Sequence, residues 1–216
     1  MDFIIRNLLW SQGTSLLLIL AALAVVAFFF YKPALLIVGA AFIFCLFLFR
    51  NPIRVCEEAF TDASVLICPS DGKVLEVTAL DPEKYQGYST KIAIFLSPLD
   101  VHVNWLPVSG TVTDVVYHKG QFVPAFLPKA SELNERNDVQ ITMANGSVIR
   151  VRQITGTIAR TIVCWVSKGQ TVQAGDTFGM MKFGSRIDLF LPKNVQVEIQ
   201  KDQKVYGGTT VLGRWI

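Results

Sequence analysis

Histidine is scarce in this sequence, and its cysteines lie far apart. Only two histidines, His102 and His118, and four cysteines occur among the 216 residues. A zinc site rich in histidine would therefore lack ligands, and no pair of cysteines has the spacing of a metal-binding or redox motif. These shortages exclude a histidine-based metal centre, so we expect no metal site and reduced, structural thiols.

An excess of one charge is also missing from most of the chain. The whole sequence has 20 basic and 17 acidic side chains. Setting aside Asp2, Arg6, Lys32 and Arg50 leaves 17 basic and 16 acidic side chains in residues 51–216, a net charge of +1. This balance lacks the basic surface that binds nucleic acid, so we do not expect nucleic acid as a partner.

Long hydrophobic runs, in contrast, are prominent near the start. Residues 14–30 and 34–49 contain no charged residue, and only Tyr31–Pro33 separates them. Each run is slightly shorter than the roughly 20 residues that a helix needs to cross a bilayer. Residues 1–50 are therefore predicted to form a membrane hairpin of two apolar helices, which either spans a thin membrane or enters it and returns.

A cleaved signal peptide is the alternative, because Ala22–Ala24 resembles a processing site. The hydrophobic run continues past that point and a second run follows at once, which disfavours cleavage. Arg6, Arg50 and Arg54 flank the hairpin, whereas only Lys32 lies at its tip. Because basic flanks favour the cytoplasmic side, we expect a cell (inner) membrane protein with the rest of its chain on the cytoplasmic face.

The remainder of the chain has the pattern of β-strands. After a polar linker at 51–62, residues 63–216 alternate apolar and polar side chains in short runs rich in β-branched residues, punctuated by turn-forming residues. Lys-Gly-Gln-x-Val occurs at 119–123 and again at 168–172, a rhythm that resembles the duplicated hammerhead strands of lipoyl and biotinyl carrier domains. The predicted fold is mainly β, a compact sandwich or barrel of that kind preceded by the membrane helical hairpin.

Residues 120–139 interrupt the strand pattern. They place apolar side chains among prolines and then become polar, with one or two helical turns expected at 128–135. One interpretation is an irregular loop packed on its own apolar residues. The other is an apolar flap that lies on the membrane near a functional site, since long loops in small domains are often functional.

Reactive side chains are concentrated in three short segments, residues 68–74, 95–110 and 181–192. Taken singly, each has an ordinary explanation. Asp71-Gly72 and Gly184-Ser185 are typical turn pairs, and His102 alternates with valines as on the polar face of a strand. Their joint occurrence, in this order, needs a more specific explanation.

The combined motifs resemble those of phosphatidylserine decarboxylases, most closely the short form with an N-terminal membrane segment. They are Ser-Asp-Gly-x-Val from Ser70, Ser-Pro-x-Asp-x-His from Ser97, and Gly-Ser-x-x-Asp-Leu from Gly184. The likeness extends over residues 55–216 and includes the runs at 134–137 and 156–166.

The resemblance implies a precursor that breaks its own bond between Gly184 and Ser185. Ser185 would attack the Gly184 carbonyl, and elimination and hydrolysis would leave a pyruvoyl group in place of the serine. The products would be a β chain, 1–184, and an α chain, 185–216, held together by strand pairing. The pyruvoyl cofactor, a built-in ketone, would form a Schiff base with phosphatidylserine and yield phosphatidylethanolamine.

The resemblance also implies roles for individual residues. Asp71 and His102 would form a triad with Ser185, in which His102 accepts the serine proton and Asp71 fixes the imidazole. Many family members have a second histidine at the position of Trp105, so the division of roles stays open. Arg136, Arg186 and Lys182 are the candidates for contacts with the lipid head group, whereas His118 is expected to be an exposed turn residue.

Two other functions remain as alternatives. A membrane-anchored, lipoyl-like binding or adaptor module without catalysis agrees with the repeat and the tether, but it needs a modified lysine at a hairpin tip. A membrane-tethered metallopeptidase needs more histidines than the sequence has. For the decarboxylase, the expected partners are a serine phospholipid, the membrane, the second chain of the same precursor and, by default, a twofold homodimer.

Overall fold

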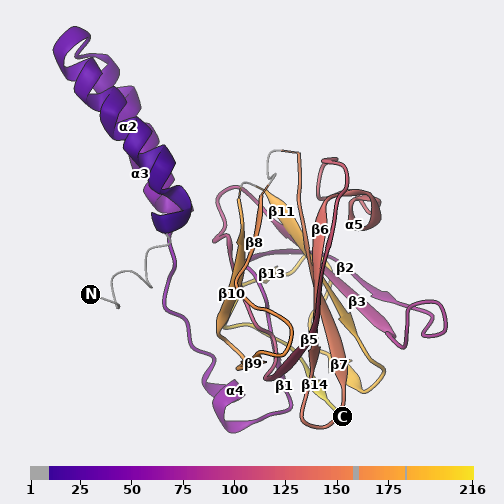
Figure 1. The fold of residues 1–216 in the computed structure, drawn as a ribbon. Helices are drawn as coiled ribbons and strands as arrows, with labels where there is room; N and C mark the ends of the chain where they lie inside the picture. Colours follow the sequence, from indigo (N-terminus) through magenta and orange to yellow (C-terminus); the bar gives the residue numbers. More distant parts are fainter. Residues whose placement is uncertain (1–9, 158–160, 183) are drawn as a thin grey trace. The chain divides into compact units, whose positions relative to one another are not determined.

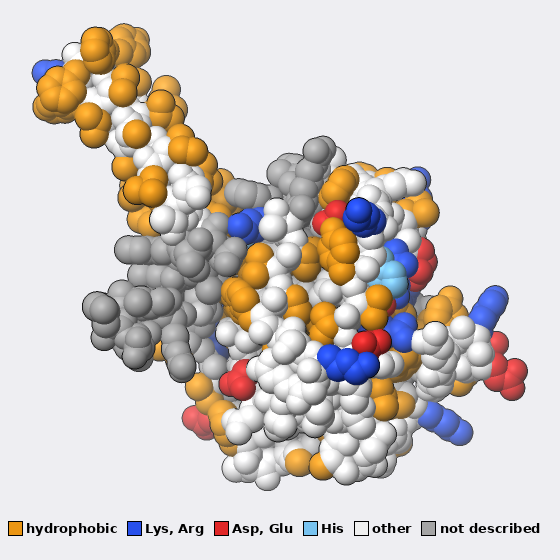
Figure 2. Space-filling view, viewed as in Figure 1, with side chains coloured by type: hydrophobic (Ala, Val, Ile, Leu, Met, Phe, Trp, Pro, Cys, Tyr) orange, Lys and Arg blue, Asp and Glu red, His pale blue; other side chains and the backbone are white. Residues whose placement is uncertain are grey.

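The computed structural model describes residues 10–157, 161–182 and 184–216, which form two compact units divided between Ile53 and Arg54. The first unit consists of α2 (Trp10–Phe30) and α3 (Ala34–Leu48), two helices that run side by side in opposite directions (Figure 1). Apolar side chains cover the surface of this hairpin (Figure 2). The predicted pair of apolar helices is therefore present, although Arg6, part of the predicted basic flank, lies outside the described residues.

One of these helices is long enough to cross a bilayer. The stretch Gly13–Phe30 has a mean hydropathy of 2.5 and little of it is buried, whereas α3 is shorter. Among the described residues, this one helix has the length and composition of a membrane span, which agrees with membrane association.

The second unit is mainly β, as the alternating pattern predicts. In the described part of this unit, eight antiparallel strands form a large sheet in the order β13-β2-β3-β11-β7-β6-β5-β9, and two smaller sheets have the orders β1-β14-β12 and β4-β10-β8. The strands are β1 (Val65–Ile67), β2 (Gly72–Ala79), β3 (Thr90–Leu96), β4 (Val103–Trp105), β5 (Gly110–His118), β6 (Arg136–Thr142), β7 (Val148–Ile154), β8 (Ile162–Cys164), β9 (Thr171–Val172), β10 (Thr177–Met181), β11 (Ser185–Leu191), β12 (Val195–Val197), β13 (Lys204–Val205) and β14 (Val211–Trp215).

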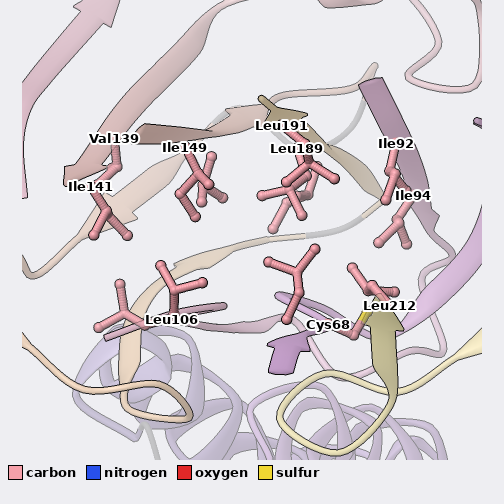
Figure 3. Packing of buried hydrophobic residues seen from close by; sticks show 14 of the residues in the cluster. Cys68, Ile92, Ile94, Leu106, Val139, Ile141, Ile149, Leu189, Leu191 and Leu212 are labelled. Atoms are coloured by element: carbon pink, nitrogen blue, oxygen red, sulfur yellow. The ribbon is translucent and has the colours of Figure 1, made fainter. Parts of the chain in front are cut away.

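The core lies between the large sheet and the two smaller ones. Figure 3 shows side chains of β6, β7, β11 and β3 facing Leu106, Cys68 and Leu212 across the interior. Alternate residues of each strand enter this layer, as in other sandwiches. Cys68 is fully buried, and this burial raises the pKa of its thiol to about 12.

The central strand β11 is buried on both of its faces. Its inner face joins the core, and part of its outer face is covered by the segment 120–139. In that segment, the short helix α5 (Ala130–Leu133) confirms the helical turn expected from the sequence. Ser131 in α5 donates a hydrogen bond to Asp188 of β11 at 2.6 Å, and the ring of Phe126 packs edge-on against Phe95 of β3 at a centroid distance of 6.1 Å.

The residues expected to be a polar linker are partly ordered by ion pairs. They contain a helix, α4 (Glu57–Thr61), which the sequence analysis did not predict. Arg214 of β14 bonds Glu58 at 2.6 Å and Asp62 at 3.3 Å. These contacts tie the segment to the β-domain, so its acidic side chains form ion pairs as well as facing solvent.

Candidate active site

Gly184 and Ser185 lie where the chain passes from one layer of the sandwich to the other. The strand before them, β10, belongs to a small sheet, whereas β11 begins at Ser185 in the middle of the large one. Gly184 has φ = +71°, a left-handed conformation that glycine adopts far more easily than other residues. The pair is therefore not a hairpin turn but the sharp entry into a buried central strand.

His102 contacts this entry directly. The backbone N–H of Gly184 donates a hydrogen bond to Nε2 of His102 at 3.3 Å. The backbone also holds the histidine in place, because the N–H of Met181 donates to the His102 carbonyl at 3.0 Å. Only 1% of His102 is exposed. The structure thus brings His102 to Gly184 and Ser185, from which it is distant in the sequence.

The hydroxyl of Ser185 is buried and unpaired. Ser185 is 0% exposed, and its Oγ has no hydrogen-bond partner among the described residues. Buried hydroxyls are nearly always hydrogen-bonded, because leaving one unpaired costs about 1–3 kcal/mol. An unpaired serine next to a backbone glycine and a histidine nitrogen is an arrangement in which the hydroxyl remains available for reaction.

The carbonyl of Gly184 is closely approached by a glycine that the sequence analysis did not single out. A Cβ added to Gly156 would overlap the Gly184 carbonyl oxygen and lie 3.3 Å from the Cβ of Ala125. Gly156 therefore allows two loops to close around this carbonyl. It was visible beforehand only as the first residue of the run 156–166, of which residues 158–160 lie outside the described residues.

Asp71 lies beside His102 but is bound mainly to other groups. Its carboxylate accepts hydrogen bonds from both terminal nitrogens of Arg54, from the N–H of Gly207 at 2.9 Å and from the N–H of Val101 at 3.4 Å. The Val101 contact links Asp71 to the backbone immediately before the histidine. The triad role of Asp71 stays a prediction, and the ion pair with Arg54 is a feature that sequence reasoning missed.

Trp105 occupies the position where many relatives of the predicted family have a second histidine. Its ring is 2% exposed and packs against Gly207 and Gly208, with the Arg54 guanidinium 5.0 Å from its centre. Cation–π contacts of this kind hold a guanidinium in place. Trp105 thus supports the Arg54–Asp71 pair and offers no group that can accept a proton.

Arg186, a predicted head-group contact, is 1% exposed. Its guanidinium donates to Asp188 at 2.5 Å and 3.1 Å, to Glu76 at 3.0 Å and to the Leu127 carbonyl at 3.3 Å. Burial alone would raise the pKa of Glu76, but Lys91 and Arg186 hold it below its usual value. Arg186 thus joins the segment 120–139 to the large sheet, and its contact with lipid stays a prediction.

The other two candidates for head-group contacts, Arg136 and Lys182, lie in different surroundings. Arg136 begins β6 and donates to the Glu132 carbonyl at 2.7 Å, with 17% of its side chain exposed. Lys182 lies two positions before Gly184 and is partly buried, and this burial lowers the pKa of its ammonium group. Along the chain, Arg186 follows Ser185 directly and Lys182 lies two positions before Gly184, whereas Arg136 is distant.

In the described ranges 10–157, 161–182 and 184–216, no cluster of three potential metal ligands occurs. The serine, histidine and backbone groups at Ser185 have an arrangement that suits the activation of a hydroxyl.

Comparisons of the sequence with known proteins point to one family. The family model described as phosphatidylserine decarboxylase matches residues 41–213. A phosphatidylserine decarboxylase proenzyme of Carboxydothermus hydrogenoformans is 48% identical over 181 residues, covering 83% of both chains. One from Gluconacetobacter diazotrophicus is 45% identical over 180 residues, covering 82% of this chain and 79% of the relative. One from Pelodictyon phaeoclathratiforme is 41% identical over 184 residues, covering 85% and 84%.

Proposed function

The chain belongs to the phosphatidylserine decarboxylase family, and on that premise we propose that it is a precursor that cleaves itself between Gly184 and Ser185 and then decarboxylates phosphatidylserine to phosphatidylethanolamine. The observation that carries this proposal is the hydrogen bond from Gly184 to His102 beside the unpaired hydroxyl of Ser185. The word proenzyme in the relatives' names describes those proteins, and it agrees with cleavage here.

His102 is the proposed base of the cleavage. In the described geometry Nε2 accepts a hydrogen bond, so it carries a lone pair that can take the Ser185 proton. The serine oxygen then attacks the Gly184 carbonyl and converts the amide into an ester. Elimination at Ser185 breaks that ester, and water replaces the nitrogen, which leaves as ammonia. A pyruvoyl group then stands at the start of the short chain.

The surroundings of Ser185 fit such a group. Ser185 is fully buried, and Gly156 and Ala125 pack closely on one side of the bond to be cleaved. The pyruvoyl ketone would supply an electron sink for the electron pair left on the α carbon when a bound amine substrate loses carbon dioxide. The chain's own contribution is to exclude water, to hold His102 next to the reacting atoms and to keep the new chain end in place.

Strand pairing explains why cleavage would not separate the two chains. From Ser185 to Leu191, β11 pairs with β3 on one side, and from Arg186 to Phe190 it pairs with β7 on the other. A strand bonded on both edges and buried on both faces is among the most stably held elements of a sandwich. The group at position 185 would therefore stay aligned with His102 after the chain is cut.

The proposed substrate also gives the apolar hairpin a function. A phospholipid with two acyl chains stays in the bilayer, so an enzyme tethered there meets it without first extracting it into water. We place the β-domain on the cytoplasmic side, because Arg50 and Arg54 follow the hairpin and such basic flanks favour that side.

One experiment tests the proposed function directly. The wild-type chain and the variant Ser185→Ala are purified in lipid nanodiscs and supplied with phosphatidylserine that carries a labelled carboxyl group. The wild type is expected to run as two fragments and to release labelled carbon dioxide, whereas the variant should stay intact and inactive. Release of carbon dioxide by uncut protein would contradict the proposal.

A further inference from the structure

A row of three buried side-chain amides crosses the interior of the sandwich. Asn137 on β6 donates from Nδ2 to Oε1 of Gln153 on β7 at 3.2 Å. Gln153 in turn donates from Nε2 to Oδ1 of Asn104 on β4 at 2.8 Å. Asn104 and Gln153 are both fully buried. This amide row connects the large sheet to the small sheet that carries β4.

The contacts of Gln153 determine how Asn104 is oriented. Nε2 of Gln153 donates to Asn104 Oδ1 and also to the backbone carbonyl of Val163 at 3.3 Å. The oxygen of Asn104 is thus used as an acceptor, and its Nδ2 remains as a donor. That Nδ2 is buried and has no partner in the part of the chain that the structure describes. Native proteins retain few such groups, so this one calls for an explanation.

Strand register places this donor on the side of the cleavage serine. Gln153 pairs with Ile187 of β11, and Ser185 lies two positions before Ile187. Alternate residues of a strand share a face, so Ser185 lies on the inner face with Ile187, a core residue. His102 lies two positions before Asn104. The buried donor without an acceptor and the buried hydroxyl without a partner thus occur in the same interior layer.

The packing of a small sheet leaves room for the amide row. A Cβ added to Gly179 of β10 would lie 2.7 Å from Nε2 of Gln153. Gly179 is not among the glycines with positive φ, so the space it leaves, rather than its backbone conformation, accounts for glycine there. The amide row thus has room at Gly179, holds Asn104 in one orientation and leaves its Nδ2 as a free donor among the described residues. These properties indicate a functional role for Asn104 rather than imperfect packing.

We propose that Asn104 is a catalytic residue of self-cleavage, whose Nδ2, unpaired among the described residues of the uncut chain, donates a hydrogen bond to Oγ of Ser185 when negative charge develops on that oxygen. This inference rests on the proposed function, because it assigns Asn104 to the same Gly184–Ser185 reaction. It adds a third participant to His102 and Ser185, one that acts on the serine oxygen itself.

Negative charge develops on Oγ in two steps. In the first, His102 takes the hydroxyl proton, Oγ bonds to the Gly184 carbonyl carbon, and the C–N bond to Ser185 breaks as its nitrogen takes up that proton. In the second, a base removes the Cα proton of Ser185, whose electrons form the Cα–Cβ double bond. The Cβ–Oγ bond then breaks with its electron pair, and Oγ leaves as an oxygen of the Gly184 carboxylate. A donor aimed at Oγ stabilises the charge in both steps.

The test compares variants of the full chain made by cell-free synthesis into lipid nanodiscs, with the cut fraction followed over time by intact mass. Asn104→Leu removes the donor. Asn104→Asp keeps the shape but can donate only when its carboxyl is protonated. Asn137→Leu is the matched control, since it disturbs the other end of the same amide row. Thermal unfolding of each variant, with Ser185→Ala added to keep the chain intact, reports whether it folds.

We expect Asn104→Leu to cleave roughly a hundredfold more slowly than the wild type, the size of effect seen for donors to a developing oxyanion. Asn137→Leu should cleave at close to the wild-type rate. Asn104→Asp should cleave faster as the pH is lowered from 8 to 5, opposite to a wild type that needs His102 unprotonated.

Three results would overturn the inference. The first is that Asn104→Leu cleaves at the wild-type rate, and the second is that Asn104→Leu and Asn137→Leu slow cleavage equally. The third is that the cleavage rate of Asn104→Asp rises with pH as it does in the wild type. The last result decides the question even if Asn104→Leu does not fold. A wild-type chain that never cleaves would overturn the proposed function, and this inference with it.

Discussion

The backbone N–H of Gly184 donates a hydrogen bond to Nε2 of His102, with 3.3 Å between the two nitrogens, although 82 positions of sequence separate them. Because Nε2 is the acceptor, the imidazole presents a lone pair to the bond between Gly184 and Ser185. The side chain expected to take the serine proton is therefore already at the reacting backbone before any reaction begins.

Replacing that histidine should block maturation. In His102→Ala the serine loses its base, and we expect cleavage to slow by roughly 100- to 10,000-fold, the usual contribution of a positioned general base. Gel mobility after timed synthesis measures the cut fraction. His118→Ala is the control, because His118 ends β5 and lies 3.8 Å from the Asp138 carboxylate. Normal maturation of His102→Ala with loss of turnover alone would confine His102 to decarboxylation.

A methyl group at position 156 should also slow cleavage. Gly156→Ala places a Cβ where the Gly184 carbonyl oxygen lies. The two loops must then separate, which displaces this carbonyl relative to the hydroxyl of Ser185. Misplacement of reacting groups by about 1 Å can cost a hundredfold in rate. Gly39→Ala is the control, since a Cβ there has nothing within 4 Å. Equal cleavage rates in the two variants would show that this close approach does not matter.

The ion pair between Arg54 and Asp71 should be important for stability. Their side chains are only 15% and 5% exposed, and removing one partner of a buried pair typically lowers the free energy of unfolding by about 3–5 kcal/mol. We expect Arg54→Met to show a loss of this order, measured by denaturant unfolding of the uncut Ser185→Ala chain in detergent. Lys73→Met is the control, because its pair with Asp202 is exposed, at 55% and 62%, and such pairs contribute little. Similar losses in both variants would contradict the prediction.

Acid should weaken the loop that precedes His102, and Asp100 is the expected cause. Burial alone would raise the pKa of Asp100, but the Lys204 ammonium and the N–H of Ser97, 2.8 Å away, hold it below its usual value. A carboxyl with a lowered pKa stabilises the fold above its unfolded value, about 3.9. This stabilisation is lost as the pH falls through the lower folded value.

The acid effect can be measured by melting temperature. In the Ser185→Ala background, the protein with Asp100 should lose thermal stability more steeply below about pH 4 than the protein with Asp100→Asn. Above about pH 5 the variant should be the less stable of the two, because it lacks the charged pair. Parallel curves over the whole range would show that Asp100 does not contribute.

Local sequence patterns predicted the features that depend on neighbouring residues. Alternating apolar positions gave the strand character of β2, β3, β6 and β7, and the uncharged runs gave the two helices. The short helix Ala130–Leu133 lies within the segment where one was expected. The motif at Gly184 and Ser185 singled out a position that the structure places next to His102, because the types and order of its residues are specific.

Contacts between distant segments could not be predicted in the same way. Nothing in the sequence near Arg54 indicates that it binds Asp71, and the approach of Gly156 to Gly184 exists only after two loops meet. Arg186 was predicted from the resemblance to contact the lipid head group, yet it is buried with Glu76 and Asp188. Such pairings depend on the order of strands in the large sheet, which the sequence pattern left open.

The intact mass of the short fragment from active enzyme is the measurement that tests the central claim most directly. Self-cleavage with pyruvoyl formation predicts a chain of residues 185–216 that is lighter, by one ammonia, than the peptide released by simple hydrolysis. It also predicts a partner chain that ends in an ordinary carboxylate at Gly184. A fully active preparation in which Ser185 is unmodified and still bonded to Gly184 would contradict the account.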